Sequence, residues 1–347
     1  MINSEKQKLI LIDALYIHNG GGKVLLDLLL DKLIEMNLSQ YVFFLFDSRY
    51  NIKNPIENHF NFLQLESTEL SRFKFYKKNK FKSILCFANV PPPVKIKVPV
   101  SIYFHNDLLI KPFNSNLKIS IQLVNFIKKL YINLLKTSKY TWIVQTNYMK
   151  SKLKKSYKIN SNNILTFPFF SEKKPKKQNL KEFNSFFYPS NNSRHKNHVN
   201  LAKAIMIADK TINLKTRIYF TIPDNEFISM PYLDLQLNNV QIINLGTLSK
   251  KDIVKTYKKV EFLLFPSINE SFGLPLIEAI NYGCKVIASD LDYVHEIVIP
   301  SKTFNPFNPK SISDAIKESL NSSRLNLSKV KVENKIDNFV KYIFSNV

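Results

Sequence analysis

Apolar runs and amphipathic stretches alternate along the chain. Runs of about four to eight apolar residues are typical of buried strands, whereas apolar residues at every third or fourth position are typical of helices. In the first half of the sequence the runs predict strands at Leu9–Asp13, Tyr41–Phe46, Ile84–Phe87, Val100–Phe104, Thr141–Gln145 and Ile164–Phe167. Amphipathic helices are predicted between them, for example over Gly22–Met36 and Leu117–Leu135. Strands that alternate with helices predict a parallel sheet covered by helices on both faces.

A polar stretch rich in Lys and Pro, Ser171–Lys181, interrupts this alternation, which then starts again. The second series predicts strands at Phe183–Tyr188, Thr216–Thr221, Val240–Asn244, Glu261–Phe265 and Lys285–Ala288. We therefore expect an α/β protein with two doubly wound, Rossmann-like domains that face each other across a cleft, residues 1–170 forming the first and 171–329 the second. Residues 330–347 are assigned to a C-terminal helix, beginning at Val330, that crosses back to the first domain. The residues that would share one face of this helix are Ile336, Phe339, Val340 and Ile343.

The composition narrows the class of protein. Apolar residues make up 45% and aromatic residues 13%, which is enough for folded cores and argues against disorder. Cys86 and Cys284 are too few for a disulfide scaffold, and they suit a reducing compartment. The apolar run Leu9–Ile17 is interrupted by Asp13 and lacks a small-residue cleavage site, so we interpret it as a buried strand rather than a signal peptide. No stretch of 18 apolar residues is found that would span a membrane.

Positive charge is concentrated in one part of the chain. The sequence holds 50 Lys and Arg against 27 Asp and Glu, a formal net charge of +23. Between Leu70 and Ser171 there are 19 basic residues and one acidic residue, Asp107. Basic and aromatic residues interleave there, which suits an anionic membrane surface. The residues assigned to that surface are Arg72, Lys74, Lys77, Lys78, Lys80 and Lys82.

Two alternatives to a membrane role stay open for this charge. An AT-rich coding sequence would enrich Lys throughout, and ordinary helices that pack one face inward would carry solvated lysines outside. Nucleic acid is less favoured as a partner, because no zinc-finger spacing, RNP signature or helix-turn-helix pattern accompanies the charge.

One segment, Phe265–Gly283, combines acidic residues with the start of a helix. It follows a predicted strand, and open α/β sheets bind ligands at that end of their strands. Pro275 suits the first turn of a helix, so the turn over Ser271–Leu274 would present backbone N–H groups to an anion. Glu270 precedes this turn, and Glu278 lies about one helical turn beyond it. Because a phosphate would repel its carboxylate, Glu278 is expected to bind a diol such as that of ribose.

Glu270 and Glu278, in this context, resemble the E-x7-E motif of the retaining glycosyltransferases of family 4, which have the two-domain GT-B fold. The flanking segments Ile243–Ser249 and Val286–Asp290 agree, and the resemblance extends over roughly Asn184–Leu320. It implies that Glu278 holds the ribose of a nucleotide sugar, and that Glu270 is a catalytic residue in contact with hydroxyls of the transferred sugar. The turn residues that it implies bind the donor, near its distal phosphate, are Ser271, Phe272, Gly273 and Leu274.

A second motif, Tyr188–His198, follows the first predicted strand of the second domain. It is similar to the loop in which this family places a lysine against the diphosphate. The resemblance implies that Lys196 binds the donor and stabilises the leaving group electrostatically. Many relatives carry an arginine about five residues earlier, where this chain has Asn191. Arg194, only two residues before the lysine, is assigned to the donor in its place, with a solvated loop residue as the alternative.

Two further elements resemble parts of the family's first domain. The glycine-rich turn His18–Lys23 separates the first strand from the first helix, and its position implies that Gly21 and Gly22 bind the donor. His105 ends a strand and resembles the histidine of the family's His-Asp element, although Asn106 interrupts the pair. This implies a catalytic position beside the donor sugar or the acceptor hydroxyl. We find neither Asp-x-Asp nor a metal-ligand cluster, so a reaction without metal or cofactor is expected.

The expected function is retaining transfer of a hexose from a nucleotide-diphosphate sugar to a glycan or a polyprenyl-linked sugar. By analogy with the family, this would serve bacterial surface polysaccharide synthesis, such as that of lipopolysaccharide. The protein would be cytoplasmic and peripheral, on the inner face of the cytoplasmic membrane. Two alternatives stay open, a sugar-nucleotide epimerase on the same fold and a non-enzymatic basic protein that binds nucleic acid.

Overall fold

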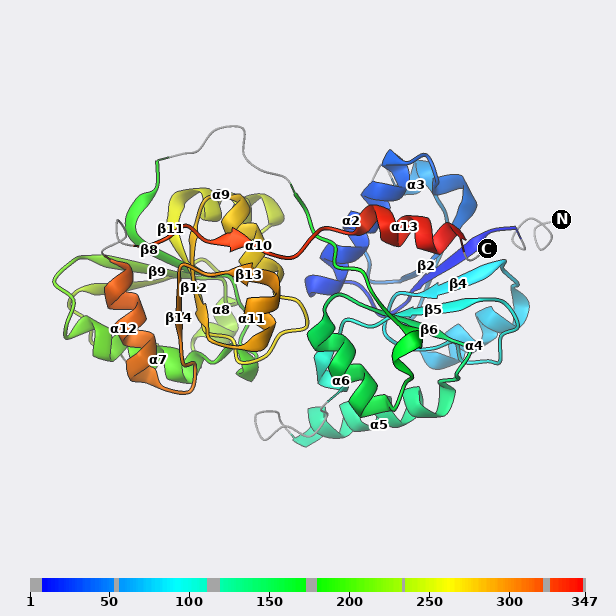
Figure 1. Cartoon of the computed structure of the whole chain (residues 1–347), viewed down its shortest axis with the longest axis horizontal. Coiled ribbons are helices and arrows are strands. Elements are labelled where there is room, and N and C mark those ends of the chain that lie inside the picture. Colours follow the sequence, from blue (N-terminus) through cyan, green and yellow to red (C-terminus); the bar gives the residue numbers. More distant parts are fainter. Residues whose placement is uncertain are drawn as a thin grey trace. The chain divides into compact units, whose positions relative to one another are not determined.

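The computed structural model describes residues 8–52, 56–110, 119–172, 180–232, 235–320 and 325–345. The chain divides into two compact units, each with its own sheet (Figure 1). The first unit comprises the chain up to Phe170 together with the segment from Glu333 onward, and the second comprises Ser171–Val332. Most of the predicted linker, residues 173–179, lies outside the described residues.

The first unit is built on a seven-stranded sheet whose neighbouring strands are all parallel. Its strands are β1 (Ile10–Ala14), β2 (Val42–Asp47), β3 (Asn61–Leu65), β4 (Ser83–Cys86), β5 (Val100–Tyr103), β6 (Thr141–Val144) and β7 (Ile164–Thr166). They are ordered β3-β2-β1-β4-β5-β6-β7. The chain runs outward from β1 to β3, then returns to β4 on the other side of β1 and continues to β7. Every residue of β1 and β2 is buried, as expected of central strands covered on both faces.

Helices cover both faces of this sheet. They are α2 (Gly20–Glu35), α3 (Ile56–His59), α4 (Glu69–Lys78), α5 (Ile119–Leu135), α6 (Asn147–Tyr157) and α13 (Ile336–Ser345), with 3₁₀ turns η1 (Ser39–Tyr41), η2 (Asp107–Leu109) and η3 (Ser161–Asn163). Figure 1 shows α2 and α13 on one side of the sheet and α4, α5 and α6 on the other. Threonine side chains begin two of them: Thr68 caps α4 and Thr146 caps α6, each accepting a hydrogen bond from a backbone amide.

The C-terminal helix α13 belongs to the first unit, as the sequence predicted. Phe339 and Val340 are fully buried, and Asp337 forms an ion pair of 2.7 Å with Lys32 of α2. The helix does not begin at Val330, and that part of the prediction is wrong. Val330 belongs to the short strand β15 (Lys329–Val330), which pairs antiparallel with β13 (Val298–Ile299) of the second unit.

The second unit has a six-stranded parallel sheet in the order β10-β9-β8-β11-β12-β14. Its strands are β8 (Glu182–Tyr188), β9 (Thr216–Phe220), β10 (Val240–Asn244), β11 (Val260–Phe265), β12 (Lys285–Ser289) and β14 (Lys302–Phe304). Its helices are η4 (Arg194–Lys196), α7 (His198–Asp209), α8 (Asp224–Phe227), α9 (Lys250–Lys259), α10 (Leu274–Asn281), α11 (Asp292–Ile297) and α12 (Pro309–Ser319). Figure 1 shows α7 and α12 on one side of this sheet and α9 and α10 on the other.

None of the described helices is both long enough and apolar enough to cross a bilayer.

Candidate active site

The strand order of the second unit places two loops together. From β8 the chain moves outward through β9 to β10, and it then returns to β11 on the other side of β8 before continuing to β12 and β14. The loops that follow β8 and β11 therefore start at the carboxyl ends of two neighbouring strands, at the point where the strand order reverses. This is the position at which open α/β sheets bind ligands. The predicted Lys196 and Glu270 motifs are these two loops.

Lys196 and Glu270 form an ion pair across that position. The Nζ of Lys196 lies 2.6 Å from the Oε1 of Glu270, and both side chains are mostly buried, with 13% and 15% of their surfaces exposed. The hydroxyl of Ser267 donates to the same carboxylate oxygen at 2.6 Å. Burial alone would raise the pKa of Glu270, but the charge of Lys196 and these hydrogen bonds hold it below its usual value. Glu270 is therefore ionised at neutral pH.

Backbone contacts hold the two loops in place. The amide of Ile268 donates to the carbonyl of His195 at 2.8 Å, which joins the loops directly. Asn197 has a left-handed backbone, with φ of +64°, and its side chain donates to the carbonyls of Pro266 and Pro306. Tyr188 donates its hydroxyl to the carbonyl of Lys196 at 2.7 Å. The position of the lysine is thus fixed from both sides of its turn.

His198 anchors the loop that carries the lysine. Its Nε2 lies 2.9 Å from the carbonyl of Asn191 and its Nδ1 lies 2.8 Å from the hydroxyl of Tyr232. Burial lowers the pKa of this imidazole to about 4, so the ring is neutral. Since a carbonyl can only accept, the ring proton is on Nε2 and the tyrosine hydroxyl donates to Nδ1.

The turn after Glu270 leads into the N-terminus of α10. Gly273 caps this helix with φ of +82°, a conformation that favours glycine, and Pro275 lies in the first turn. Phe272 is buried, whereas Ser271 and Leu274 are half-buried. The sequence therefore correctly located a helix N-terminus, with its partial positive charge, directly after Glu270.

Glu278 lies further along α10 and differs from Glu270 in its electrostatics. Burial raises the pKa of its carboxyl, and a hydrogen bond from the hydroxyl of Tyr257, at 3.2 Å, only partly opposes this. The surroundings thus move the pKa values of the two glutamates in opposite directions. Such divergence is typical of carboxyl groups that do different work in one site.

Arg194 begins the 3₁₀ turn η4 that ends at Lys196, and its side chain is exposed. The turn thus carries two cationic side chains, only one of which, Lys196, is mostly buried beside Glu270. The assignment of Arg194 to the donor stays a prediction.

In the first unit, the glycine turn and His105 lie in contact. The glycines lie in the first turn of α2, which begins at Gly20, and Gly20 itself has a left-handed φ of +62°. A Cβ placed on Gly22 would lie 3.0 Å from the Cε1 of His105, whereas one on Gly21 would meet nothing within 4 Å. Only Gly22 therefore needs to be a glycine for the imidazole to fit.

Residues from other elements also hold His105. Its backbone amide donates to the side-chain oxygen of Asn89 at 2.7 Å, and its Nε2 lies 3.3 Å from the carbonyl of Phe87. Burial lowers the pKa of this ring to about 4. The neutral ring thus carries its proton on Nε2, toward that carbonyl, and its Nδ1 is an acceptor. Asp107, two residues after His105, forms an ion pair of 2.9 Å with Lys152 of α6.

A partly buried contact network involves the segment before the glycine turn. Tyr16 ends the segment after β1 with φ of +87° and donates its hydroxyl to the Oε1 of Glu69, the first residue of α4. The Oε2 of the same carboxylate accepts a hydrogen bond of 2.7 Å from the hydroxyl of Tyr131 in α5. One carboxylate thus joins the segment before the glycine turn to α5.

Arg72 was expected at a membrane surface, and this prediction is wrong. Only 2% of its side chain is exposed, and its Nε lies 2.8 Å from the Oδ2 of Asp13 in β1. Its other nitrogens donate to the carbonyls of Val90 and Pro91. A buried carboxylate in a central strand needs a cation, and Arg72 supplies it. The remaining lysines of this group are at least partly exposed: Lys74, Lys77, Lys78, Lys80 and Lys82.

Two residues of the site were not predicted. Ser267 has a local signal, because it is a polar residue close after the buried strand β11 and three residues before Glu270. Tyr257 has none, since it lies in α9 and reaches Glu278 only through the fold. Among the described residues, no group of three or more His, Cys, Asp or Glu side chains is placed to hold a metal ion.

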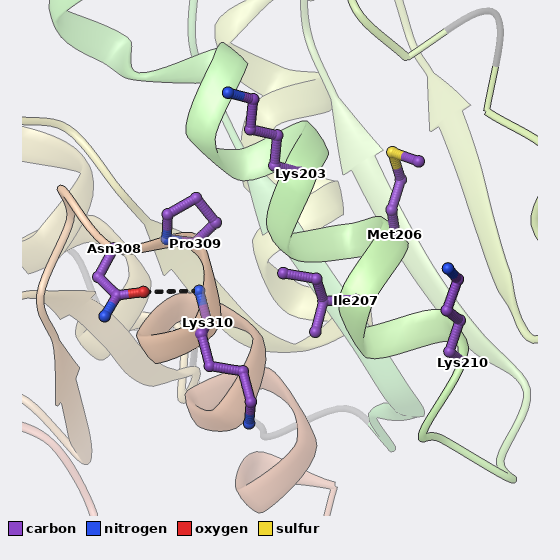
Figure 2. Close-up of a pocket in the computed structure, with 7 residues that line it drawn as sticks. All are labelled: Lys203, Met206, Ile207, Lys210, Asn308, Pro309 and Lys310. Carbon is purple, nitrogen blue, oxygen red and sulfur yellow. Dashed lines mark hydrogen bonds between the residues drawn. The ribbon is translucent and has the colours of Figure 1, made fainter.

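A hollow of about 480 Å³ lies elsewhere in the second unit, between α7 and the start of α12 (Figure 2). Its lining residues are Lys203, Met206, Ile207, Lys210, Asn308, Pro309 and Lys310. None of the predicted site residues is among them. The contacts of Lys196 and Glu270, rather than this hollow, define the candidate site.

Comparison with known proteins gives a family match for the second unit. The sequence profile of the family described as glycosyl transferases group 1 matches residues 170–336, which is the second unit with its flanks. The O-antigen chain mannosyltransferase RfbU of Salmonella typhimurium is 28% identical over 201 residues, which cover 56% of this chain and 56% of that protein. The match thus spans little more than half of this relative's length.

Solved structures share the fold over most of the chain. WaaG, a glycosyltransferase involved in lipopolysaccharide biosynthesis, is 13% identical and superposes with a TM-score of 0.69 over 91% of each chain. HepE of Anabaena, solved in complex with UDP and glucose, is also 13% identical, with a TM-score of 0.63 over 91% of each chain. Residues 170–336 therefore match the group 1 glycosyl transferase family, and the chain has the two-domain GT-B fold.

Proposed function

We propose that the protein is a retaining glycosyltransferase that uses a nucleotide-diphosphate sugar. The observation that carries this proposal is the buried Lys196–Glu270 pair at the carboxyl ends of β8 and β11, directly before the N-terminus of α10. A cation and a helix N-terminus are groups that bind a diphosphate, and a fixed carboxylate suits the hydroxyls of a sugar. The Anabaena relative in complex with UDP and glucose supports the same class of donor.

Each predicted site residue of the second unit then has a role. Lys196 and the turn Ser271–Leu274 bind the diphosphate, with Arg194 as a second cation. Glu278 binds the ribose hydroxyls. Glu270 contacts the hydroxyls of the sugar that is transferred.

The predicted site residues of the first unit act on the sugar and on the acceptor. We assign Gly21 and Gly22 to the transferred sugar, and His105 to the acceptor hydroxyl. The Nδ1 of His105 suits this role, because the neutral ring leaves that nitrogen as an acceptor.

The chemistry is electrostatic. The bond between the anomeric carbon and the phosphate oxygen breaks, and the acceptor oxygen bonds to the same carbon on the same face. The single proton of the acceptor hydroxyl leaves its hydrogen bond to the Nδ1 of His105 and passes to the departing phosphate oxygen as the new bond forms. Negative charge grows on the diphosphate during this step, and Lys196 with the α10 amides stabilises it. We propose that these groups suffice without a metal ion, so that EDTA leaves the rate unchanged.

We further propose a lipid-linked glycan as acceptor, at the inner face of the cytoplasmic membrane. Support comes from the basic first unit and from relatives that act in O-antigen and lipopolysaccharide synthesis. An anionic leaflet attracts such a surface with about 1 kcal/mol per lysine close to it.

A two-stage experiment tests the donor proposal. Thermal-shift measurements against a panel of nucleotide sugars first identify the donor, because a ligand at 100 times its Kd stabilises by about 2.7 kcal/mol. Transfer from that donor is then measured for Glu270→Gln and Lys196→Met, and each should lower kcat by about 100-fold or more. The matched controls are Glu318→Gln and Lys302→Met, which disrupt an exposed Lys–Glu pair in the same unit.

Three outcomes would contradict the proposal. Full transfer by Glu270→Gln would show that this carboxylate is not needed for the reaction. Chemical change of the donor with no acceptor present would indicate an epimerase. Salt-sensitive binding to DNA that Glu270→Gln leaves unaffected, with no stabilisation by any nucleotide sugar, would indicate a nucleic-acid-binding protein.

A further inference from the structure

Helix α5 is turned with its apolar side outward. Apolar residues recur along it at intervals of four, four, three and four, which places them on one face. All five are more than half exposed: Ile119, Leu123, Ile127, Leu130 and Leu134. An ordinary surface helix buries such a stripe, so α5 leaves unpaired the face that would normally make the core.

The opposite face of α5, which packs on the protein, carries both polar and apolar residues. Asn125 and Ile132 are buried there, and Lys129 donates its Nζ to the carbonyl of Ile110 at 2.8 Å. Lys136, just beyond the helix, donates to the carbonyl of Tyr157, and Tyr131 donates to Glu69 of α4. These directed contacts fix the rotation of the helix, so the exposure of the apolar stripe follows from the fold.

The sequence around this stripe is basic, and the carboxylate that contacts α5, Glu69, comes from α4. Between Ile119 and Lys158 the sequence contains nine lysines and neither Asp nor Glu. Lys128 borders the stripe and is exposed, as are Lys139, Lys154 and Lys155. Two copies of the chain meeting through this face would bring like charges together, which disfavours a dimer. Acyl chains under anionic headgroups satisfy the apolar and the basic parts at once.

We propose that α5 lies in the membrane interface, with its apolar stripe among the acyl chains of an anionic leaflet and its lysines at the headgroups. The inference rests on the membrane partner of the proposed function and names the element that makes the contact. It also differs from the surface predicted from sequence, because the main contact is hydrophobic insertion by α5 rather than charge along Arg72–Lys82. A helix of 17 residues lying flat does not span the bilayer.

Binding to vesicles tests the proposal. The probes are phosphatidylcholine vesicles with and without phosphatidylglycerol, in a sedimentation assay with the full chain. Leu123→Gln with Ile127→Gln should weaken binding to the anionic vesicles by about 10- to 100-fold, since two large apolar side chains lose their burial. The matched control is Leu214→Gln with Ile228→Gln, two exposed apolar residues of the second unit, which should bind as the wild type does.

A fluorescence measurement reports insertion directly. Ile127→Trp introduces a second tryptophan, and the native Trp142 is fully buried in the first unit and serves as an internal reference. Brominated lipids should quench the emission of the introduced tryptophan and leave the emission of the wild type unchanged.

Unchanged vesicle binding by the glutamine variant, or emission from Ile127→Trp that brominated lipids do not quench, would overturn the proposal. So would a wild-type dimer, seen by analytical ultracentrifugation, that the glutamine pair converts to a monomer. Thermal shift with the identified nucleotide sugar is measured on the same samples. A wild type that binds the donor but not the anionic vesicles overturns the α5 inference alone, whereas a wild type that binds the vesicles through α5 but no nucleotide sugar overturns the proposed function alone.

Discussion

The Lys196–Glu270 pair makes a prediction about stability that depends on pH. Replacing Lys196 by Met keeps the length of the side chain and its packing near the ring of Phe265, 5.7 Å from Nζ, but removes the charge. Glu270 is then a mostly buried carboxylate that keeps its hydrogen bond from Ser267 but has lost the cation beside it. Removing one partner of a buried pair costs about 3–5 kcal/mol. Because 13–15% of each side chain is exposed, we expect the lower end, about 3 kcal/mol.

The sign of the pH dependence follows from the pKa of Glu270. In the wild type that pKa is lowered, so the ionised carboxylate stabilises the fold above its unfolded pKa, about 4.3, and this stability is lost as the pH falls through the lower folded value. In Lys196→Met burial is no longer offset by the lysine, and the pKa of Glu270 rises above about 4.3. The variant therefore loses stability as the pH rises through that raised value, and its deficit relative to the wild type grows from about pH 4 to pH 7.5.

Differential scanning calorimetry at about pH 4, 5.5 and 7.5 measures this deficit. At the highest pH we expect the melting transition of the second unit to fall by about 6–12 °C, from about 2–4 °C per kcal/mol. Lys196→Met with Glu270→Gln should recover most of the loss and show no pH trend, and Lys302→Met, at an exposed pair, should cost less than about 1 kcal/mol. A deficit below about 2 °C, or one equal at all three pH values, would refute the reasoning.

The remaining predictions concern the first unit. Gly22→Ala should change the melting temperature little, since the helix propensity of alanine offsets the tight contact with His105, but should lower transfer about tenfold by displacing that ring. Asp31→Ala, at an exposed position of the same helix and outside the site, should leave transfer unchanged. Equal activity of the two variants would show that the close contact between Gly22 and His105 does not matter for transfer. Arg72→Met should lower the free energy of unfolding of the first unit by about 3–5 kcal/mol in chemical denaturation, because it leaves the buried carboxylate of Asp13 without its cation. Lys74→Gln should change this free energy by less than about 0.5 kcal/mol. Similar small losses for both would mean that Arg72 is not needed to compensate Asp13.

The central strands could be predicted from sequence because both of their faces are buried. β1, β2, β11 and β12 lie within a residue or two of the predicted ranges, since a continuous apolar run is what such a strand requires. β3 was missed because it is an edge strand, half exposed and interrupted by Asn61 and Gln64. β14 was missed because three residues give no period to recognise.

The site could be predicted where it is local and not where the fold creates it. Glu270, Gly273 and Pro275 follow one another closely in sequence, so their turn was predicted. The partners Arg72 and Asp13 are separated by 59 residues, and only the packing of α4 on β1 brings them together. Sequence pattern also could not orient α5, because its periodicity identifies an apolar face without saying which way that face turns.

The carboxylate of Glu69 makes the outer helix α5 and the segment before the glycine turn parts of one thermodynamic system. Tyr131 and Tyr16 occupy its two oxygens, so a shift of either hydroxyl alters the electrostatics that the other experiences. Linkage then works in both directions. If lipid restrains Tyr131 and thereby changes nucleotide-sugar affinity by some factor, the nucleotide sugar must change lipid affinity by the same factor. Lipid and nucleotide sugar would then change each other's affinity by one shared factor, and Glu69→Gln would bring that factor toward one without abolishing either affinity.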